Sequence, residues 1–212
     1  MRSMTWGSFV LFASVCAAVG VTRLVEMSIS RAHQAWLATC GAQRHPERVF
    51  PFMKALHAAV IVGGPLEVLF FARAWWPPLT AVALVFFLAA QALRWWVIRS
   101  LGVHWNVQIV SSTTQVGVVT SGPYRWVRHP NYVAVLVELL ALPLLHGAWV
   151  TAVLGLAAHG VILSARIRAE EAVLFADPLY RATMSGKPRF LPQWSKLVAS
   201  RPLARELAAD DV

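Results

Sequence analysis

Residues 122–132 read Gly-Pro-Tyr-Arg-Trp-Val-Arg-His-Pro-Asn-Tyr, a polar, cation-rich segment that runs directly into an apolar stretch. A second polar group follows, where Arg166 and Glu170 are one helical turn apart and therefore share a face of a helix. An acidic side chain can hold an ammonium group, and an arginine can bind a carboxylate or an ionised oxygen through paired hydrogen bonds. These residues predict a site for a cationic cofactor and an anionic acceptor. The alternative is an ordinary salt bridge at the end of a helix.

The composition indicates what kind of fold must position these groups. Of the 212 residues, 58% are hydrophobic and only 14% are charged. This is too apolar for an ordinary soluble domain, so we expect residues 1–212 to form one all-α integral membrane domain. A net charge of +9 could indicate a nucleic-acid partner. The cations lie in loops between apolar runs, however, and form no basic stripe, so we expect no nucleic acid; neither the histidines nor the cysteines have metal-ligand spacing, so we expect no metal.

Five apolar segments have about the 20 residues that a helix needs to cross a bilayer. Only His146 and Gly147 separate the fourth from the fifth, so these two segments should form a tight helical hairpin. The hairpin would return Arg166 and Glu170 to the membrane face that carries His129, which favours a functional site over a simple salt bridge. The spans are predicted at residues 5–21, 50–71, 78–98, 132–145 and 148–167.

The positions of lysine and arginine predict an orientation for these spans. With five spans, every lysine and arginine except Arg2 and Arg73 falls on one side of the membrane. Cations near span ends favour the cytoplasmic side. We therefore expect an N-terminus outside, a cytoplasmic C-terminus and a cytoplasmic cofactor site, in a protein of the bacterial inner membrane.

Two segments outside the spans also carry predictions. Residues 22–49 mix apolar and polar side chains as an amphipathic helix on the cytoplasmic surface would, either as a topological anchor or as part of a substrate entrance. Residues 195–212 are polar and predict a C-terminal tail. Inside the predicted spans, Glu67 and Glu138 are costly in an apolar layer. Glu138 could form a hydrogen bond in helix packing or support the site.

Three motifs occur in order within residues 94–192. Gly-x-Tyr is followed by Arg-His-Pro-x-Tyr at 122–132, Arg-x-x-x-Glu-Glu lies at 166–171, and Arg-Phe-Leu-Pro lies at 189–192. In this order and spacing the region resembles the isoprenylcysteine carboxyl methyltransferase family. The resemblance implies a catalytic methyltransferase region in an all-helical membrane enzyme. It also implies that S-adenosylmethionine binds at the cytoplasmic face and that a lipid acceptor enters from the bilayer.

The resemblance also implies roles for single residues. Arg166 would be catalytic and face the acceptor, while Glu170 would be catalytic and contact the cofactor. The family often has a histidine where this chain has Val116, so a contact there would come from the backbone. The cofactor-binding residues that the resemblance implies are Gln108, Val116, Gly117, Val118, Val119, Tyr124, His129, Pro130, Asn131, Tyr132 and Glu170.

The chemistry of methyl transfer leaves the acceptor open. Transfer from a sulfonium to an oxygen depends on in-line positioning and exclusion of water. The carboxylate of an isoprenylcysteine-type lipid needs no base, whereas the hydroxyl of an alkylpyrone-type lipid would be helped by one, with His129 or Glu170 as candidates. The N-terminal half resembles bacterial members of the family, some of which methylate alkylpyrone hydroxyls.

Other function classes are compatible with parts of the pattern. A membrane sterol reductase that uses NADPH carries a similar His-Pro-x-Tyr element, although such proteins are usually longer. A phospholipid N-methyltransferase would use the same methyl donor. A non-catalytic scaffold or transporter is disfavoured, because the chain is short and has no inverted repeat.

Overall fold

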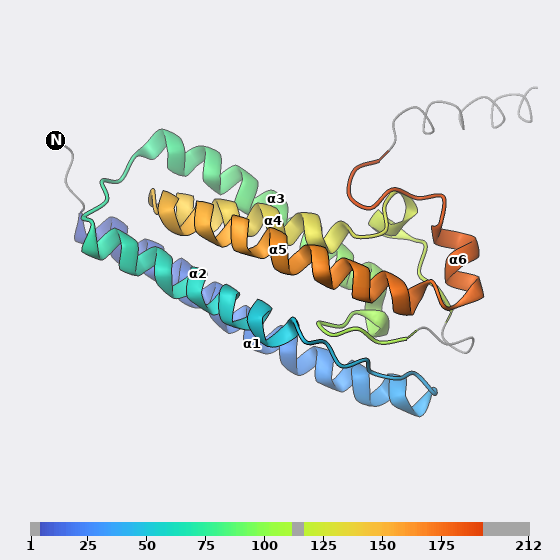
Figure 1. The fold of residues 1–212 in the computed structure, drawn as a ribbon. Coiled ribbons are helices and arrows are strands. Elements are labelled where there is room, and N and C mark those ends of the chain that lie inside the picture. Colours follow the sequence, from blue (N-terminus) through green and yellow to red (C-terminus); the bar gives the residue numbers. More distant parts are fainter. Residues whose placement is uncertain (1–4, 112–116, 193–212) are drawn as a thin grey trace, which may run out of the picture.

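The computed structural model describes residues 5–111 and 117–192, so Val116 and the predicted tail at 195–212 lie outside the described residues. Figure 1 shows long helices running side by side, with short helices and loops gathered at one end. The elements are α1 (Trp6–Thr39), α2 (Phe50–Phe70), α3 (Pro77–Leu101), η1 (Gly102–His104), η2 (Gly122–Arg125), α4 (Pro130–Leu144), α5 (Trp149–Leu174) and α6 (Pro178–Met184).

The predicted all-α membrane fold is confirmed, with one refinement of the span count. Among the described residues, four helices are long and apolar enough to cross a membrane, namely α1, α2, the run formed by α3 and η1, and α5. Helix α4 is apolar but has 15 residues. At 1.5 Å per residue it is about 22 Å long, shorter than a hydrocarbon layer of roughly 30 Å. The fourth predicted span is therefore a shorter helix packed among the others.

The predicted hairpin between α4 and α5 is present. Pro143 lies near the end of α4, and the amide of Ala148 donates to its carbonyl at 3.0 Å. Gly147 occupies the turn with φ +74°, a left-handed conformation that favours glycine. The two helices then pack against each other, so the start of α4 and the end of α5 lie at the same end of the molecule.

Helix α1 extends past the first predicted span. We expected a span at residues 5–21 followed by an amphipathic segment at 22–49, and α1 continues unbroken as helix to Thr39 over 34 residues. Residues 22–39 contain neither proline nor glycine, so no residue there terminates the helix. At 1.5 Å per residue α1 is about 51 Å long and extends well past a single bilayer crossing.

The helices pack as a chain of neighbours. Helix α4 packs against α3 and α5, α5 packs against α2, and α2 packs against α1. The close approach of α2 and α5 depends on Gly155, where an added Cβ would lie 2.7 Å from the side chain of Val60. An apolar core joins α1, α2, α3 and α4 and includes Phe12, Val19, Val68, Phe87, Leu142 and Leu145.

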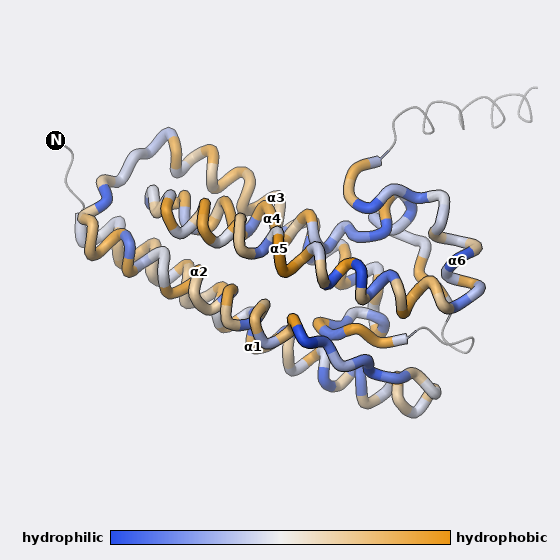
Figure 2. Tube along the Cα trace, viewed as in Figure 1, coloured by the Kyte–Doolittle hydropathy of each residue, from blue (hydrophilic) through white to orange (hydrophobic). Residues whose placement is uncertain are grey.

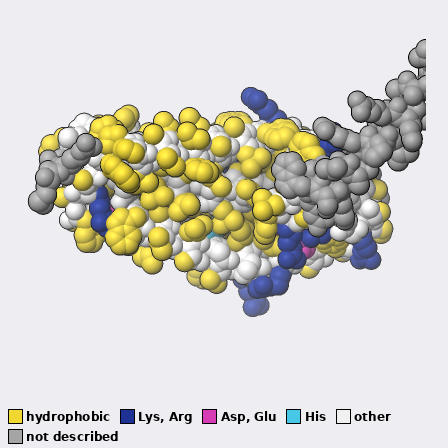
Figure 3. Space-filling model, turned by 90° about the horizontal axis from the view of Figure 1, so that it is seen from above, with side chains coloured by type: hydrophobic (Ala, Val, Ile, Leu, Met, Phe, Trp, Pro, Cys, Tyr) yellow, Lys and Arg dark blue, Asp and Glu magenta, His cyan; other side chains and the backbone are white. Residues whose placement is uncertain are grey.

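The surface separates apolar from polar regions. Hydrophilic residues concentrate at the end that carries α6, whereas hydrophobic residues follow the long helices (Figure 2). Figure 3 shows hydrophobic side chains over most of one face, with lysine and arginine mainly toward one end. This is the distribution expected when lipid surrounds the helices and water meets their ends.

Two acidic residues inside the helices have structural partners. The buried carboxylate of Glu67 accepts hydrogen bonds from the amides of Val150 and Thr151, at 3.2 and 2.7 Å, at the start of α5. It therefore satisfies amide groups that a helix N-terminus leaves free. Arg73 forms a salt bridge with the same carboxylate at 2.9 Å.

Glu138 belongs to a buried cluster between α1, α3 and α4, which we call the closed cluster (Arg23, Glu26, Gln91, Arg94 and Glu138). Arg94 donates to both oxygens of Glu26, at 2.8 and 2.6 Å. Arg23 donates to both oxygens of Glu138, at 2.8 and 2.7 Å, and also pairs with Glu26. Gln91 adds a bond of 3.0 Å to Glu138. Of the two roles considered for Glu138, the contacts match helix packing.

Candidate functional site

The cation-rich segment is held at the start of α4 by tertiary contacts. Gly122 has φ +57°, and a Cβ there would lie 2.0 Å from the Oγ of Ser100, so the loop presses directly on α3. Pro130 begins α4 at a position where proline is well tolerated, and its buried ring does not line the cavity described below.

The C-terminal part of the described chain returns to cover this segment. The amides of Arg128 and His129 donate to the carbonyls of Pro188 and Arg189, both at 2.9 Å. Lys187 donates from its ammonium to the carbonyl of Tyr124 at 2.7 Å. The third sequence motif therefore lies along the first, although some 60 residues separate them in the chain.

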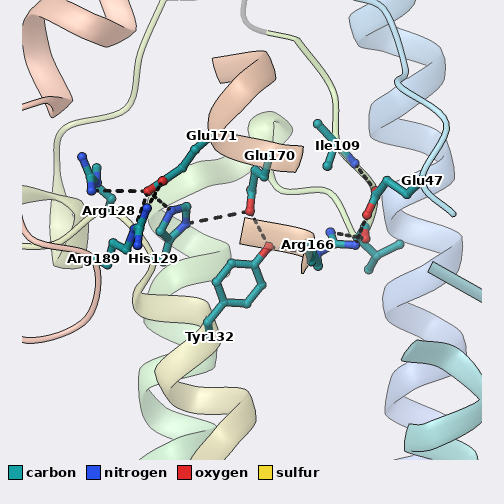
Figure 4. Close-up of polar contacts among 10 residues, drawn as sticks. Glu47, Ile109, Arg128, His129, Tyr132, Arg166, Glu170, Glu171 and Arg189 are labelled. Atoms are coloured by element: carbon teal, nitrogen blue, oxygen red, sulfur yellow. Dashed lines mark hydrogen bonds and ion pairs between the residues drawn. The ribbon is translucent and has the colours of Figure 1, made fainter. Parts of the chain in front are cut away.

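Glu171 ties these parts together. Its carboxylate accepts from Arg189 at 3.1 and 2.6 Å, pairs with Arg128 at 3.3 Å, and lies 3.1 Å from the Nε2 of His129 (Figure 4). The side chain of His129 is 4% exposed, so its orientation is set by the protein. Glu171, the second acidic residue of the Glu-Glu pair, thus holds the cation-rich segment against the C-terminal part of the described chain.

Glu170 and Arg166 meet at Tyr132. The hydroxyl of Tyr132 donates to Oε2 of Glu170, and Nε of Arg166 donates to the same hydroxyl at 2.8 Å. Nδ1 of His129 lies 3.8 Å from Glu170. The second oxygen of Glu170, Oε1, has no partner within the described residues, and the side chain is 24% exposed. The hairpin therefore brings Arg166, Glu170, His129 and Tyr132 together as expected.

Glu47 is a further member of the cluster that sequence reasoning missed. Its carboxylate accepts from Nη1 of Arg166 and, at 2.6 Å, from the amide of Ile109, and its side chain is 1% exposed (Figure 4). Burial raises the pKa of the Glu47 carboxyl, while the positive charge of Arg166 acts in the opposite direction. Nη2 of Arg166 also donates to the carbonyl of Val107 at 2.8 Å. One feature of the sequence could have pointed to Glu47. Glu26 and Glu47 are the only acidic residues within 22–49, and in the structure each pairs with an arginine.

A cavity of about 220 Å³ connects these groups. Its wall combines apolar side chains such as Leu37, Met53 and Leu174 with the polar cluster. Burial of the Tyr124 hydroxyl raises its pKa, so the phenol stays neutral in this wall. Among the predicted site residues, the cavity is lined by Gln108, Gly117, Val118, Val119, Tyr124, His129, Asn131, Tyr132, Arg166 and Glu170.

Comparison with known proteins identifies the family of this chain. The sequence pattern of the isoprenylcysteine carboxyl methyltransferase family matches residues 82–176. The chain is 35% identical over 167 residues to the uncharacterized protein YpbQ of Bacillus subtilis (strain 168), covering 77% of this chain and 96% of that protein. It is 28% identical over 165 residues to an uncharacterized protein of Haemophilus influenzae (strain ATCC 51907 / DSM 11121 / KW20 / Rd), covering 74% and 91%.

The chain belongs to the isoprenylcysteine carboxyl methyltransferase family. Membership implies a membrane methyltransferase with a lipid-associated substrate, and methyltransferases of this family generally use S-adenosylmethionine. The family pattern spans all of α4 and α5, so it includes His129, Tyr132, Arg166 and Glu170. Glu47 and the Arg189 segment lie outside the matched residues and join the site only through the fold.

The polar atoms left free in the cavity fit the methyl donor of this family. S-adenosylmethionine carries an ammonium, a carboxylate and an adenine, and so needs an acidic group, donors and an apolar slot. Glu170 has a free oxygen, and Oδ1 of Asn131, Nε2 of His104 and Nε of Arg128 are buried without a partner in the described part of the chain. Among these atoms lie the apolar residues Trp105, Ile109, Val118, Val119 and Leu174.

Proposed function

We propose that this protein transfers a methyl group from S-adenosylmethionine to an oxygen of a lipid acceptor at the membrane surface. The observation that carries the proposal is the shared cavity. Glu170, one oxygen of which has no partner in the described part of the chain, and Arg166 line the same 220 Å³ space, which extends from the polar loops to apolar residues between α2, α4 and α5. A charged donor at the polar end and a lipid at the apolar end would thus meet beside Arg166.

On this proposal Glu170 holds the donor's ammonium group. The carboxylate is already oriented by Tyr132 and keeps Oε1 for a ligand. Asn131 would add its free carbonyl oxygen nearby, while Val118 and Val119 offer an apolar surface for the adenine. When bound, the donor supplies an electrophilic methyl group on a sulfonium. Val116, also predicted to contact it, lies outside the described residues.

Arg166 would orient the acceptor oxygen. Each of its three guanidinium nitrogens makes one bond to the protein, namely to Tyr132, Glu47 and the carbonyl of Val107. A guanidinium has five N–H groups, so two remain for a ligand. Because the side chain is held on three sides, it is pre-organised for an anionic or partly ionised oxygen.

The acceptor oxygen belongs either to a carboxylate of an isoprenylcysteine-type lipid or to a hydroxyl of an alkylpyrone-type lipid. Both present an acidic oxygen on a long apolar tail. We further propose the bacterial inner membrane as the location, with the N-terminus outside and the site cytoplasmic, because lysine and arginine concentrate beside the polar end of the helices.

Cofactor binding tests the proposal directly. The detergent-purified protein is titrated calorimetrically with S-adenosylmethionine and, separately, with NADPH. Micromolar binding of the methyl donor alone, followed by a methyl mass increase on a lipid oxygen, supports the proposal. Binding of NADPH alone would point to a sterol-type reductase, and methylation of an amine headgroup would point to a phospholipid N-methyltransferase.

A further inference from the structure

Two histidines line the apolar part of the cavity, away from the groups assigned to the donor. His57 on α2 and His159 on α5 face each other with ring centroids 5.3 Å apart and planes at 90°. Both line the same cavity as Arg166, together with the apolar residues Met53 and Val135. His159 is 1% exposed. Ionisable side chains at this depth in a membrane helix are costly, which makes a ligand-binding role worth testing.

The hydrogen bond of His57 fixes its tautomer. Its Nδ1 lies 2.8 Å from the carbonyl oxygen of Met53, and a carbonyl only accepts, so Nδ1 must carry the hydrogen. In the neutral ring Nε2 is then a bare acceptor. No described residue bonds to that nitrogen. The cavity therefore contains an acceptor that calls for a hydrogen-bond donor on the ligand.

His159 adds a donor and an acceptor that the protein leaves unused. Both of its ring nitrogens are buried and lack a partner within residues 5–111 and 117–192. Two arginines, Arg94 and Arg166, line the same cavity, so an additional positive charge on either histidine would be unfavourable in these apolar surroundings. The pair is thus best satisfied, in its neutral form, by a hydroxyl, which both donates and accepts.

The spacing along α5 places this pair within reach of a single head group. His159 and Arg166 are seven residues apart, so they share a face and their backbones are separated by about 10.5 Å. Both side chains lean toward the helix N-terminus, and because arginine is the longer, its guanidinium lies closer to His159 than the backbone distance indicates. One ring bearing two oxygens could therefore contact both.

We propose that His57 and His159 form a hydroxyl-binding subsite for the acceptor. The acceptor is accordingly a lipid whose ring carries a hydroxyl in addition to the oxygen held at Arg166, and not a lipid with a carboxylate alone. A hydroxyl donates to Nε2 of His57 and accepts from the N–H of His159. A carboxylate has no hydrogen to donate, so it would place an oxygen lone pair against the lone pair of Nε2, which is repulsive. This inference rests on the proposed function, because it assigns the acceptor end of the same cavity.

The test compares two acceptor probes in binding measurements without the methyl donor. Pentadecyl resorcinol has two ring hydroxyls, whereas N-acetyl-S-farnesylcysteine has a carboxylate and no hydroxyl. We expect wild type to bind the resorcinol about tenfold more tightly. His57→Asn keeps a donor near Nδ1 but removes the acceptor at Nε2, and should weaken resorcinol binding about tenfold without affecting the other probe. His57→Gln, which carries an acceptor near Nε2, should restore most of the affinity.

Two controls make the result decisive. His146→Asn alters another buried histidine, which contacts Ser8 and is outside the cavity lining, and should leave both affinities unchanged. His159→Phe, with His57 left intact, should also weaken binding of the resorcinol and not of the other probe. Equal weakening of both probes, or no weakening of the resorcinol by either variant, would overturn the subsite. Donor titration of the same preparations is read separately, so failure of wild type to bind S-adenosylmethionine would count against the proposed function alone.

Discussion

Two buried polar clusters in this molecule contain similar residue types but differ in how completely their polar atoms are bonded. In the closed cluster, both oxygens of Glu26 and both oxygens of Glu138 are bonded to arginine or glutamine side chains, although Nε of Arg23 has no partner among the described residues. We call Glu47, Tyr132, Arg166 and Glu170 the open cluster. In it one oxygen of Glu170 and two N–H groups of Arg166 have no partner among residues 5–111 and 117–192.

The difference separates packing from binding. A cluster whose charges are all paired holds helices in one relative orientation, because breaking any pair leaves a buried charge unmet. A cluster with polar atoms left over near a cavity is prepared for a ligand that will complete it. Glu138 and Glu170 have similar chemistry in isolation. Their bonding, and not their burial alone, is the basis for proposing that Glu170 and not Glu138 binds a ligand.

The largest effect is expected at Arg166. Arg166→Ala should abolish turnover and also lower the free energy of unfolding by about 3–5 kcal/mol, because Glu47 would remain as an unpaired buried charge. Denaturant unfolding in detergent and a methyl-transfer assay measure the two effects. The double variant Glu47→Gln with Arg166→Met should recover much of the stability but no turnover. Arg168→Ala, an exposed neighbour on α5, is the matched control and should behave as wild type.

A substitution in the closed cluster should lower stability without changing donor binding. Glu26→Gln leaves Arg94 buried with a weakened partner, so we expect the free energy of unfolding to fall by about 3 kcal/mol. Donor affinity should change less than twofold, because no member of this cluster belongs to the donor end. A donor affinity reduced more than tenfold, with stability unaltered, would remove the distinction between the clusters.

An intermediate effect is expected at Glu170. Glu170→Gln should weaken S-adenosylmethionine about 10- to 100-fold in calorimetry, because a charge-assisted bond to the ammonium becomes a neutral one. Stability should change little, since the side chain is partly exposed. Tyr132→Phe removes the hydroxyl that orients the carboxylate and accepts from Arg166 but keeps the Glu170 charge, so its loss of donor affinity should be smaller. A donor affinity unaffected by Glu170→Gln would contradict the assignment of Glu170.

The smallest effect is expected at Arg189, whose side chain is 49% exposed. Arg189→Gln should lower stability by about 0–1 kcal/mol, because exposed ion pairs contribute little. Donor affinity should fall only a few-fold, since the backbone bond to His129 remains while the salt bridge to Glu171 is lost. A comparison at low and high salt checks this, because the difference from wild type should shrink as salt screens the pair.

Local and periodic features of the sequence were readable without a structure. Apolar run lengths predicted the membrane helices, since bilayer thickness sets the length of a spanning helix. The two-residue connection predicted the hairpin between α4 and α5, and hence that Arg166, Glu170 and His129 meet. The polar residues that suggested a surface segment after residue 21 include Arg23 and Glu26, which pair with Glu138 on α4 and Arg94 on α3, and the sequence did not reveal these partners.

By itself, the sequence determined the all-α membrane class, the hairpin and the order of the three motifs, because hydropathy and spacing are properties of neighbouring residues. Only the tertiary structure decided that Glu47 pairs with Arg166 and that residues 187–189 cover the cation-rich segment. It also decided that His57 and His159 share a cavity with the site. These contacts join distant segments through helix packing, and no local pattern of residue types encodes which distant side chains will meet.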